Sequence, residues 1–375
     1  MKKVCIFFTA VVLLGSILFT NCQQPAVTSA KMQIEQKNWD AAIEQGKLAI
    51  ERMPNDTEAY FVLGQAYAGK KMYREMNEAY TKCLEISPAH SAEIEQDRLK
   101  HWINLFNSGT ALLRQGQFSE AIPNYLIAAE LIPDKKETYQ NLAYAYGQTG
   151  NDSAAIDVYR KAIEIAPADL EIKNSLGLLL YHGKQYDEAI RVLSEVIEKA
   201  TPQDKIYNDA LYNLAYSYDL KGDSKKAIET YESALKTSPN DKDLIFNMGR
   251  LYFIQENYAK AIESFKKIIA IDPEDFETNY NIGLGYIAIA DSLSAEAKNT
   301  DERGNFILPE KERNQREQQS KTNFELSIPY LEKATQIQPD NANPWMYLGK
   351  AYIRVGMLEK GQAAFEKADS LKGQE

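Results

Sequence analysis

Hydrophobic residues recur along this chain with a helical period, and one pattern occurs twice within 208–275, so that Leu211 of the first copy aligns with Ile245 of the second. The first half of each copy places apolar residues at i, i+3 and i+7, and the second half at i, i+1, i+4, i+7 and i+8. Both spacings put the apolar side chains on one face of an α-helix. The aligned positions are Leu211, Leu214, Tyr218, Ala227, Ile228 and Tyr231 in the first copy, and Ile245, Met248, Tyr252, Ala261, Ile262 and Phe265 in the second.

Small residues and prolines also occupy matching positions in the two copies. Ala215 and Gly249 stand where the first helix of each pair meets the second, and a bulky side chain at such a crossing would cost about 1–3 kcal/mol. Pro239 and Pro273 follow the second helices, because a proline ring removes an amide donor and clashes with the preceding turn. Each copy is therefore predicted to be a helical hairpin.

This pattern resembles the tetratricopeptide repeat, a unit of roughly 34 residues in which a large residue, Leu-Gly, Tyr, Ala, an aromatic residue and Pro follow one another. The resemblance implies an all-α fold, a right-handed α-solenoid of about nine helical hairpins in which each repeat packs on its neighbours. It also implies that the chain binds other proteins along a concave groove lined by the first helices. It does not identify the partner.

The same positions divide the chain into nine repeats, although extra residues interrupt the repeat phase at 91–101 and again before residue 208. The first repeat is poor in signature residues, as expected of a terminal cap. The predicted segments are a lipoprotein-type signal peptide at 1–21, repeats 1 and 2 at 22–90, a charged helical linker at 91–101, repeats 3 to 7 at 102–275, repeat 8 at 276–341 and repeat 9 at 342–375.

Repeat 8 contains an insertion at 291–323 that is rich in Glu, Lys, Arg and Gln. We expect the two helices of this repeat to continue beyond the solenoid surface and to join at a tip with Phe306, Ile307 and Leu308. The alternative is a solvated, partly disordered loop, which runs of charge favour.

Repeat 9 is the last one in the sequence, and no solvating helix follows it. We expect its second helix to expose an apolar face, which would be a surface for a homo-oligomer or for a partner protein.

The segment at 1–21 has the form of a secretory signal, because two lysines precede a mostly apolar run at positions 4–19. The run Leu18-Phe19-Thr20-Asn21-Cys22 resembles a bacterial lipoprotein processing box, which implies lipid attachment at Cys22; Asn21 is larger than the small residue usual before the cysteine. The alternative is an uncleaved signal anchor, although about 16 apolar residues fall short of the roughly 20 that cross a bilayer. Both alternatives predict an exported protein that is tethered to a membrane of the bacterial cell envelope.

Composition is that of a globular protein, with 44% hydrophobic and 26% charged residues. The formal net charge of -10 becomes more negative once the signal, which carries Lys2 and Lys3 and no acid, is removed. A nucleic-acid partner is thereby disfavoured, since phosphate binding requires clustered Lys and Arg. Besides Cys5 in the signal and Cys22, only Cys83 remains, and it occupies a small apolar repeat position, so we expect a buried thiol there.

No catalytic constellation is apparent in this sequence, and the chain is not expected to be an enzyme. The three histidines are His90 and His101 around the linker and His182 near the end of a first helix. The Gly283-Leu284-Gly285 run lies inside a predicted helix and lacks the third glycine and the preceding strand of a phosphate-binding loop. No carboxylate pair stands out as an acid and base. No cofactor and no metal are expected.

The candidate binding residues are asparagines that recur at one position of the first helices. In peptide-binding members of the family, amides at such a position clasp an extended peptide, because one amide offers both donors and an acceptor. The alternative is that each asparagine only bonds a neighbouring helix. The residues are Asn107, Asn141, Asn213, Asn247 and Asn281, with Ser175 filling the gap.

Aromatic and basic residues flank these asparagines in the C-terminal half of the predicted groove. Aromatic and arginine side chains are typical of binding hot spots. We therefore expect a partner segment with apolar anchors and an acidic group, although one or two of the aromatic residues would fit equally in the core between repeats. The predicted contact residues are Tyr212, Tyr216, Phe246, Arg250 and Tyr280, accompanied by Phe253, Lys350 and Arg354.

Three functional hypotheses follow from this sequence. The first is a membrane-tethered scaffold that binds extended peptide segments or partner helices, most naturally from envelope proteins. The second is an assembly factor for an outer-membrane complex, similar to the pilotins and to barrel-assembly lipoproteins. The third, which has the weakest support, is a cryptic enzyme or an enzyme-regulatory subunit with a site around the insertion at 291–323.

Overall fold

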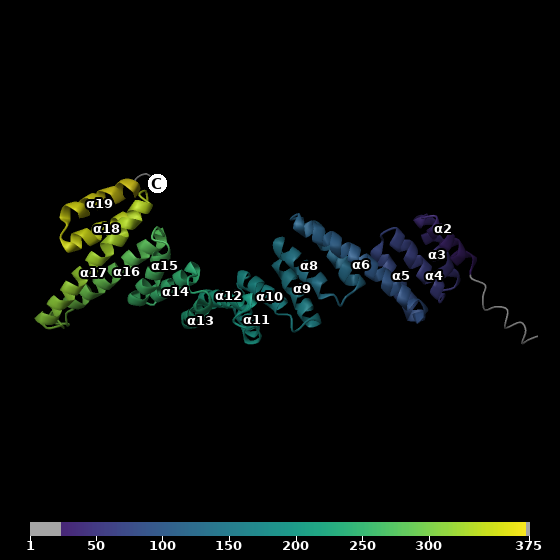
Figure 1. Ribbon diagram of the computed structural model, residues 1–375, viewed down its shortest axis with the longest axis horizontal. Coiled ribbons are helices and arrows are strands. Elements are labelled where there is room, and N and C mark those ends of the chain that lie inside the picture. Colours follow the sequence, from purple (N-terminus) through teal and green to yellow (C-terminus); the bar gives the residue numbers. More distant parts are fainter. Residues whose placement is uncertain (1–23, 373–375) are drawn as a thin grey trace, which may run out of the picture. The chain divides into compact units, whose positions relative to one another are not determined.

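The computed structural model describes residues 24–372, and in this range the chain forms eighteen α-helices. It divides into two compact units, residues 1–172 and 173–375, and the division falls inside the block predicted as repeats 3 to 7. Helices of the first unit are α2 (Pro25–Glu35), α3 (Trp39–Arg52), α4 (Thr57–Gly69), α5 (Tyr73–Ile86), α6 (Ser91–Arg114), α7 (Phe118–Leu131), α8 (Lys136–Gln148) and α9 (Asp152–Ile165), with a short 3-10 helix at Pro88–His90 (Figure 1).

The second unit begins within α10 (Leu170–His182). It continues with α11 (Tyr186–Lys199), α12 (Lys205–Lys221), α13 (Ser224–Thr237), α14 (Lys242–Ile254), α15 (Tyr258–Ile271), α16 (Phe276–Lys298), α17 (Glu310–Ile337), α18 (Ala342–Val355) and α19 (Leu358–Lys372). Within each unit the helices pack on their neighbours in chain order as hairpins, which is the arrangement of an α-solenoid. The predicted all-α fold of about nine hairpins is confirmed.

The periodic apolar residues form the core between the two helices of each hairpin and between successive hairpins. In the second unit, Tyr231 on α13 and Phe265 on α15 are almost fully buried at equivalent repeat positions. Burial of one such side chain contributes roughly 1.5–3 kcal/mol. The helix pattern predicted from the sequence therefore marks the side chains that hold the repeats together.

The predicted crossings of small residues are tight. A Cβ atom placed on Gly249 would lie 2.7 Å from Phe265, and one placed on Gly64 would lie 2.3 Å from the Tyr80 ring. Real Cβ atoms do not approach other atoms so closely, so even alanine would force a shift at either crossing. At these two crossings, glycine lets the aromatic ring of the second helix approach the backbone of the first.

The segment at 91–101 is part of one continuous helix, since α6 runs from Ser91 to Arg114. His101 of this segment is buried beside Asp97, and the Trp102 indole donates a 2.9 Å hydrogen bond to Thr138 Oγ1 on α8. The interruption of the repeat phase at this segment thus lengthens a first helix at its N-terminal end.

The insertion in repeat 8 is a helical extension and not a loop. Helices α16 and α17 lie side by side (Figure 1) and join through residues 299–309, where one isolated β-bridge links Thr300 and Phe306. Phe306 and Ile307 are more than half exposed at this tip. The expected protruding hairpin is therefore what the chain forms.

Two further expectations concern the cysteines and the membrane. Cys83 is a free, buried thiol, as predicted, and burial raises its pKa to about 11. Cys22, Cys5 and the rest of the signal segment lie outside the described residues. Among residues 24–372, none of the helices has the length and apolar character that crossing a membrane requires.

Candidate functional site

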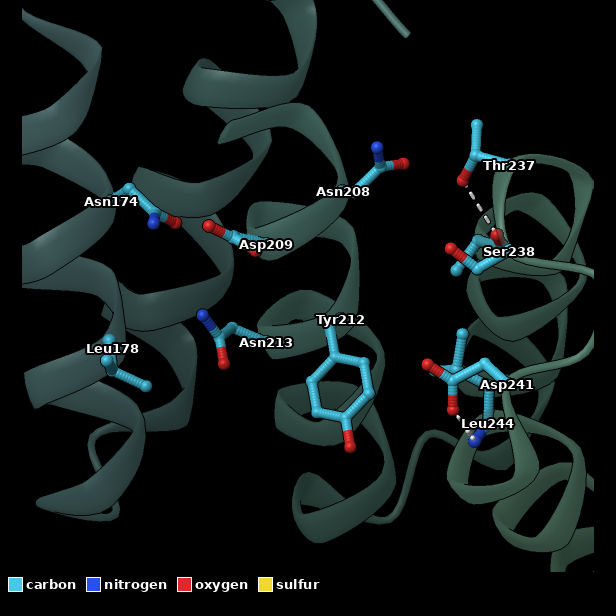
Figure 2. A pocket seen from close by; sticks show the side chains of 11 residues that line it. Asn174, Leu178, Asn208, Asp209, Tyr212, Asn213, Thr237, Ser238, Asp241 and Leu244 are labelled. Carbon is cyan, nitrogen blue, oxygen red and sulfur yellow. Dashed lines mark hydrogen bonds between the residues drawn. The ribbon is translucent and has the colours of Figure 1, made fainter. Parts of the chain in front are cut away.

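A polar hollow of about 310 Å³ lies on the first helices of the second unit. Figure 2 shows it across α12, with Asp209 and Asn213 extending toward Asn174 and Leu178 of α10, and with Ser238 and Asp241 on the opposite side. Ala234 and Thr237 from the end of α13, and Leu244 from α14, complete the wall together with Asn208 and Tyr212. Three successive hairpins thus contribute to one concave surface.

The repeat geometry explains why these side chains meet. Asp209 and Asn213 are four residues apart on α12, so they stand on the same face of that helix. Asp241 is the N-cap of α14, where its Oδ1 accepts hydrogen bonds from the amides of Asp243 (3.1 Å) and Leu244 (3.1 Å). The cap fixes Asp241 at the rim of the hollow and leaves its second carboxylate oxygen without a hydrogen bond in the described chain.

The hollow contains acceptors that lack donors. The side-chain oxygens of Asn174 and Asn208 are buried, yet neither has a hydrogen-bond partner in the described chain. Leaving a buried acceptor unsatisfied costs about 1–3 kcal/mol. None of the lining residues in the described part of the chain is Lys, Arg or His, while Asp209 and Asp241 bring two carboxylates. The surface is therefore built to receive hydrogen-bond donors.

The predicted asparagines of the second unit differ in their surroundings. Asn213 lines the hollow, and its side chain makes no hydrogen bond in residues 24–372. Asn247 donates to Tyr216 Oη at 2.8 Å and to the main-chain oxygen of Asp243 at 2.8 Å, and Asn281 donates to the main-chain oxygen of Glu277 at 2.8 Å. Among these three asparagines, Asn213 is therefore the one whose side chain lines the hollow without a hydrogen bond in the described chain.

The two predicted asparagines of the first unit do not belong to the lining of this hollow. Asn107 on α6 is exposed. Asn141 on α8 donates a 3.3 Å hydrogen bond to Tyr125 Oη, which also pairs with Thr110 Oγ1 at 3.0 Å. Burial raises the pKa of Tyr125, so its phenol stays protonated as part of this contact between helices. Their proposed role in peptide contact remains a prediction.

The predicted aromatic contacts divide between the hollow and the core. Tyr212 lines the hollow, and its hydroxyl lies 3.1 Å from that of Tyr216. Burial raises the pKa of Tyr216 far above its ordinary value, and the hydrogen bond with the Tyr212 hydroxyl raises it further. Phe246 packs on the Phe265 ring with centroids 5.5 Å apart, so it is a partly buried residue at the core between the two helices of one repeat.

Tyr280 on α16 is half-buried between aromatic neighbours. Its ring stacks on Phe276 with centroids 5.9 Å apart and meets Tyr347 edge-on at 6.0 Å. Burial, followed by the charge interactions with Tyr347 and Glu277, raises the pKa of Tyr280 to about 12. The stack joins α16 to α18, so Tyr280 serves the packing of repeats 8 and 9.

The basic residues predicted in the groove already have partners within the chain, and their contact with an acidic partner remains a prediction. Arg250 forms an ion pair with Asp219, whose side chain is 7% exposed, and Lys350 pairs with Asp291 at 2.6 Å. Arg354 donates to Ser294 Oγ at 2.9 Å and lies over the Phe324 ring. These cations already have partners within the chain, because acids and a hydroxyl on the neighbouring first helices face them.

Sequence reasoning missed six polar residues of the hollow, which are Asn174, Asn208, Asp209, Thr237, Ser238 and Asp241. A signal for part of this set was present. Asp209, Asp243 and Glu277 follow one another at the same repeat spacing as the asparagines and stand four residues before them. Reading positions i and i+4 of each first helix together would have shown acids beside the amides.

Comparison with protein families gives one consistent result along the chain. Family models described as tetratricopeptide repeat match residues 57–90, 102–168, 175–200, 209–241, 243–275 and 342–375. The chain is a tetratricopeptide-repeat protein. Family members act through protein–protein interaction, and none of the matching models describes an enzyme.

Solved structures similar to this tetratricopeptide-repeat protein cover about half of it or somewhat more. MamA from Desulfovibrio magneticus RS-1 is 22% identical, with 47% of this chain and 97% of that chain covered and a TM-score of 0.44. YrrB, described as a TPR protein with an unusual peptide-binding site, is 22% identical, with 51% of this chain and 95% of that chain covered and a TM-score of 0.43. PilF from Pseudomonas aeruginosa is 17% identical, with 65% of this chain and 99% of that chain covered and a TM-score of 0.41. A search of curated proteins finds no match.

Proposed function

We propose that this protein is a membrane-tethered scaffold that binds an extended segment of a partner protein in the polar hollow on α10, α12 and α14. The observation that carries the proposal is the pair of buried amide oxygens, Asn174 Oδ1 and Asn208 Oδ1, that have no donor in the described chain. An extended segment would supply those donors from its main-chain amides or its side chains.

The rest of the hollow supports the same mode of binding. The Asn213 amide stands open beside the hollow and offers donors as well as an acceptor to a passing main chain. Leu178, which is 37% exposed, and the ring of Tyr212 supply apolar surface for a side chain of the partner. Main-chain hydrogen bonds would give affinity, while the apolar contacts would select among sequences.

Site-specific photocrosslinking in living cells tests the proposal. A photoreactive amino acid would replace Leu178 in the hollow, and a matched control would carry it at Ile271, which is also exposed but lies on a second helix. We expect the Leu178 position to form a discrete crosslink to a protein that mass spectrometry identifies.

Asn213→Ala provides the decisive comparison, because the side chain of Asn213 makes no hydrogen bond in the described chain and its removal should not disturb folding. We expect this substitution to reduce the crosslink from Leu178 strongly. Equal crosslinking from Leu178 and Ile271, or a crosslink that is unaffected by Asn213→Ala, would argue against the hollow as the binding site.

The tether is tested separately from the hollow. We propose that a lipid on Cys22 anchors the exported chain to a membrane of the bacterial envelope, a proposal that rests on the apolar run at positions 4–19 and the processing box before Cys22. Cys22→Ser should move the protein from the membrane fraction to the soluble fraction and abolish incorporation of a labelled fatty acid. Unchanged fractionation with unchanged labelling would exclude this anchor.

A further inference from the structure

The hollow and its surroundings carry more negative charge than the neighbouring cations of the described chain neutralise. Within the described residues, Asp209 has a single cationic neighbour, the highly exposed Lys205, at 3.9 Å. Asp243 and Glu277, at the equivalent positions of the next two first helices, have no ion-pair partner in residues 24–372. By contrast, Arg250 and Lys350 in the same part of the groove are each paired with an acid.

The acids run parallel to the asparagines on one surface. Asp209, Asp243 and Glu277 each precede an asparagine by four residues, and residues i and i+4 of a helix share a face. The side chains of Asn247 and Asn281 confirm the adjacency, since each bonds the main-chain oxygen of the acid four residues earlier. Asp209 and Asn213 line the hollow, so this face is the one that a bound segment would meet.

We propose that the segment bound in this hollow is cationic, and that its lysine or arginine side chains pair with Asp209 and Asp241 and donate to the amide oxygens of Asn174 and Asn208. This inference rests on the proposed function and adds the chemical class of the ligand to it. These four groups are the carboxylates and the donor-less buried oxygens of the lining, and an ammonium or guanidinium group brings several donors together with a positive charge.

Electrostatics at longer range act in the same direction. The formal net charge of the chain is -10, so a basic segment is attracted from a distance and association is steered toward the protein. Within the groove, the row at Asp209, Asp243 and Glu277 would meet further basic residues along the same extended segment. A partner segment rich in acids would be repelled by this surface.

Substitutions that remove the charge of these acids but keep the size of their side chains test whether the acids act through their charge or only support the structure. Asp209→Asn and Asp241→Asn keep the size of each side chain, and Asn at position 241 remains a good N-cap for α14. The matched control is Glu229→Gln with Glu263→Gln, which removes two exposed negative charges from the second helices α13 and α15. Circular dichroism and the urea midpoint establish that each variant is folded.

The probe is a displayed library of random peptides, selected on the purified full chain and on both double variants. The relevant peptides are those that no longer bind when Asn213 is replaced by Ala. We expect these peptides to be enriched in Lys and Arg when they are selected on the wild type or on the control. On Asp209→Asn with Asp241→Asn this enrichment should disappear, and the dissociation constant of a selected peptide, measured by fluorescence anisotropy, should rise about tenfold or more.

Salt provides a second measurement that does not depend on the double variant. When NaCl is raised from about 50 mM to about 500 mM, the affinity of the wild type for a selected basic peptide should decrease. The same rise in salt should decrease the affinity of the single variant Asp209→Asn by a smaller factor. Peptides that need Asn213 but show no excess of Lys and Arg would overturn the inference and leave the peptide-binding hollow intact. If no selected peptide depends on Asn213, the proposed function fails with it.

Discussion

The Nδ2 atom of Asn247 donates a 2.8 Å hydrogen bond to the phenol oxygen of Tyr216, which stands on the first helix of the preceding repeat. This bond ties α14 to α12 beside the hollow. It shows that an asparagine of the repeated series can serve the stacking of repeats, while Asn213 at the equivalent position of α12 stays open.

Tyr216→Phe removes the acceptor of this bond and should lower stability by about 1 kcal/mol, since that is the net value of a typical intramolecular hydrogen bond. The measurement is the urea midpoint of the full chain followed by circular dichroism. Tyr212→Phe is the matched control, because it removes the neighbouring hydroxyl at 3.1 Å and keeps the bond from Asn247. The idea fails if the two variants lose the same stability.

Asn174→Ala combined with Asn208→Ala should have the opposite effect on the free protein. Each change removes a buried oxygen without a partner in the described chain and replaces Asn by a better helix former, so we expect a gain of about 1 kcal/mol. Binding of a peptide selected on the wild type should weaken at the same time. A loss of stability in the double variant would mean that these oxygens are satisfied in solution.

The sequence predicted the repeats well because each hairpin is a local structure. Leu211, Tyr231 and Phe265 are buried where the repeat pattern places them, since helix period and small-residue spacing are properties of neighbouring positions. The binding surface was harder to predict, because its groups come from different repeats. Nothing in the local pattern around Arg250 reveals that Asp219, on the first helix of the preceding repeat, neutralises it.

Sequence reasoning also missed residues of the hollow that lie just outside the repeat signature. Asp241 precedes the first residue of α14, so its place in the hollow depends on how the N-cap turns the chain. Asn208 lies on α12, which begins three residues earlier, at Lys205, than the repeat phase suggests. Such details follow from packing between hairpins and not from the period of one helix.

Acid should weaken the first unit through Asp169. The carboxylate of Asp169 loses solvation, which raises its pKa, but the 2.6 Å contact with Lys136 and the amides of Ile172 and Glu171 outweigh this and hold the pKa below its usual value. A depressed pKa in the folded state means that the stabilisation is present above the pKa of the unfolded chain and is lost as the pH falls through the folded value.

The stability of the wild type should therefore fall between about pH 5 and about pH 2, and Lys136→Met should make that fall less steep. Urea midpoints measured across this range test the expectation. Lys161→Met is the control, since Lys161 pairs with Glu164 on the exposed surface at 2.8 Å and contributes little. Identical pH profiles for the two variants would contradict the role given to Lys136.

Gly249→Ala should destabilise the second unit by about 1–3 kcal/mol, because the new Cβ would overlap the Phe265 ring. Phe265→Leu provides a smaller partner for that Cβ. In a double-mutant cycle, the loss caused by Gly249→Ala should be smaller when residue 265 is Leu. Additive losses would show that the crossing relaxes in another way.

The base and the tip of the α16–α17 hairpin should differ in their contribution to stability. At the base, the Ser320 hydroxyl donates a 2.7 Å hydrogen bond to the buried main-chain oxygen of Ala290, so Ser320→Val should cost about 1–3 kcal/mol. The tip holds exposed Phe306 and Ile307, and the ion pair between Arg316 and Glu296 beside it is exposed as well.

Replacing residues 299–309 by a short flexible turn keeps both helices with Ser294 and Ser320 and removes the tip. We expect the urea midpoint to change by less than the equivalent of about 1 kcal/mol, since exposed ion pairs and exposed apolar residues contribute little to folding. A loss as large as that of Ser320→Val would mean that the tip packs against the repeats. A stable, shortened chain would show instead that the tip is free to serve interaction with another molecule.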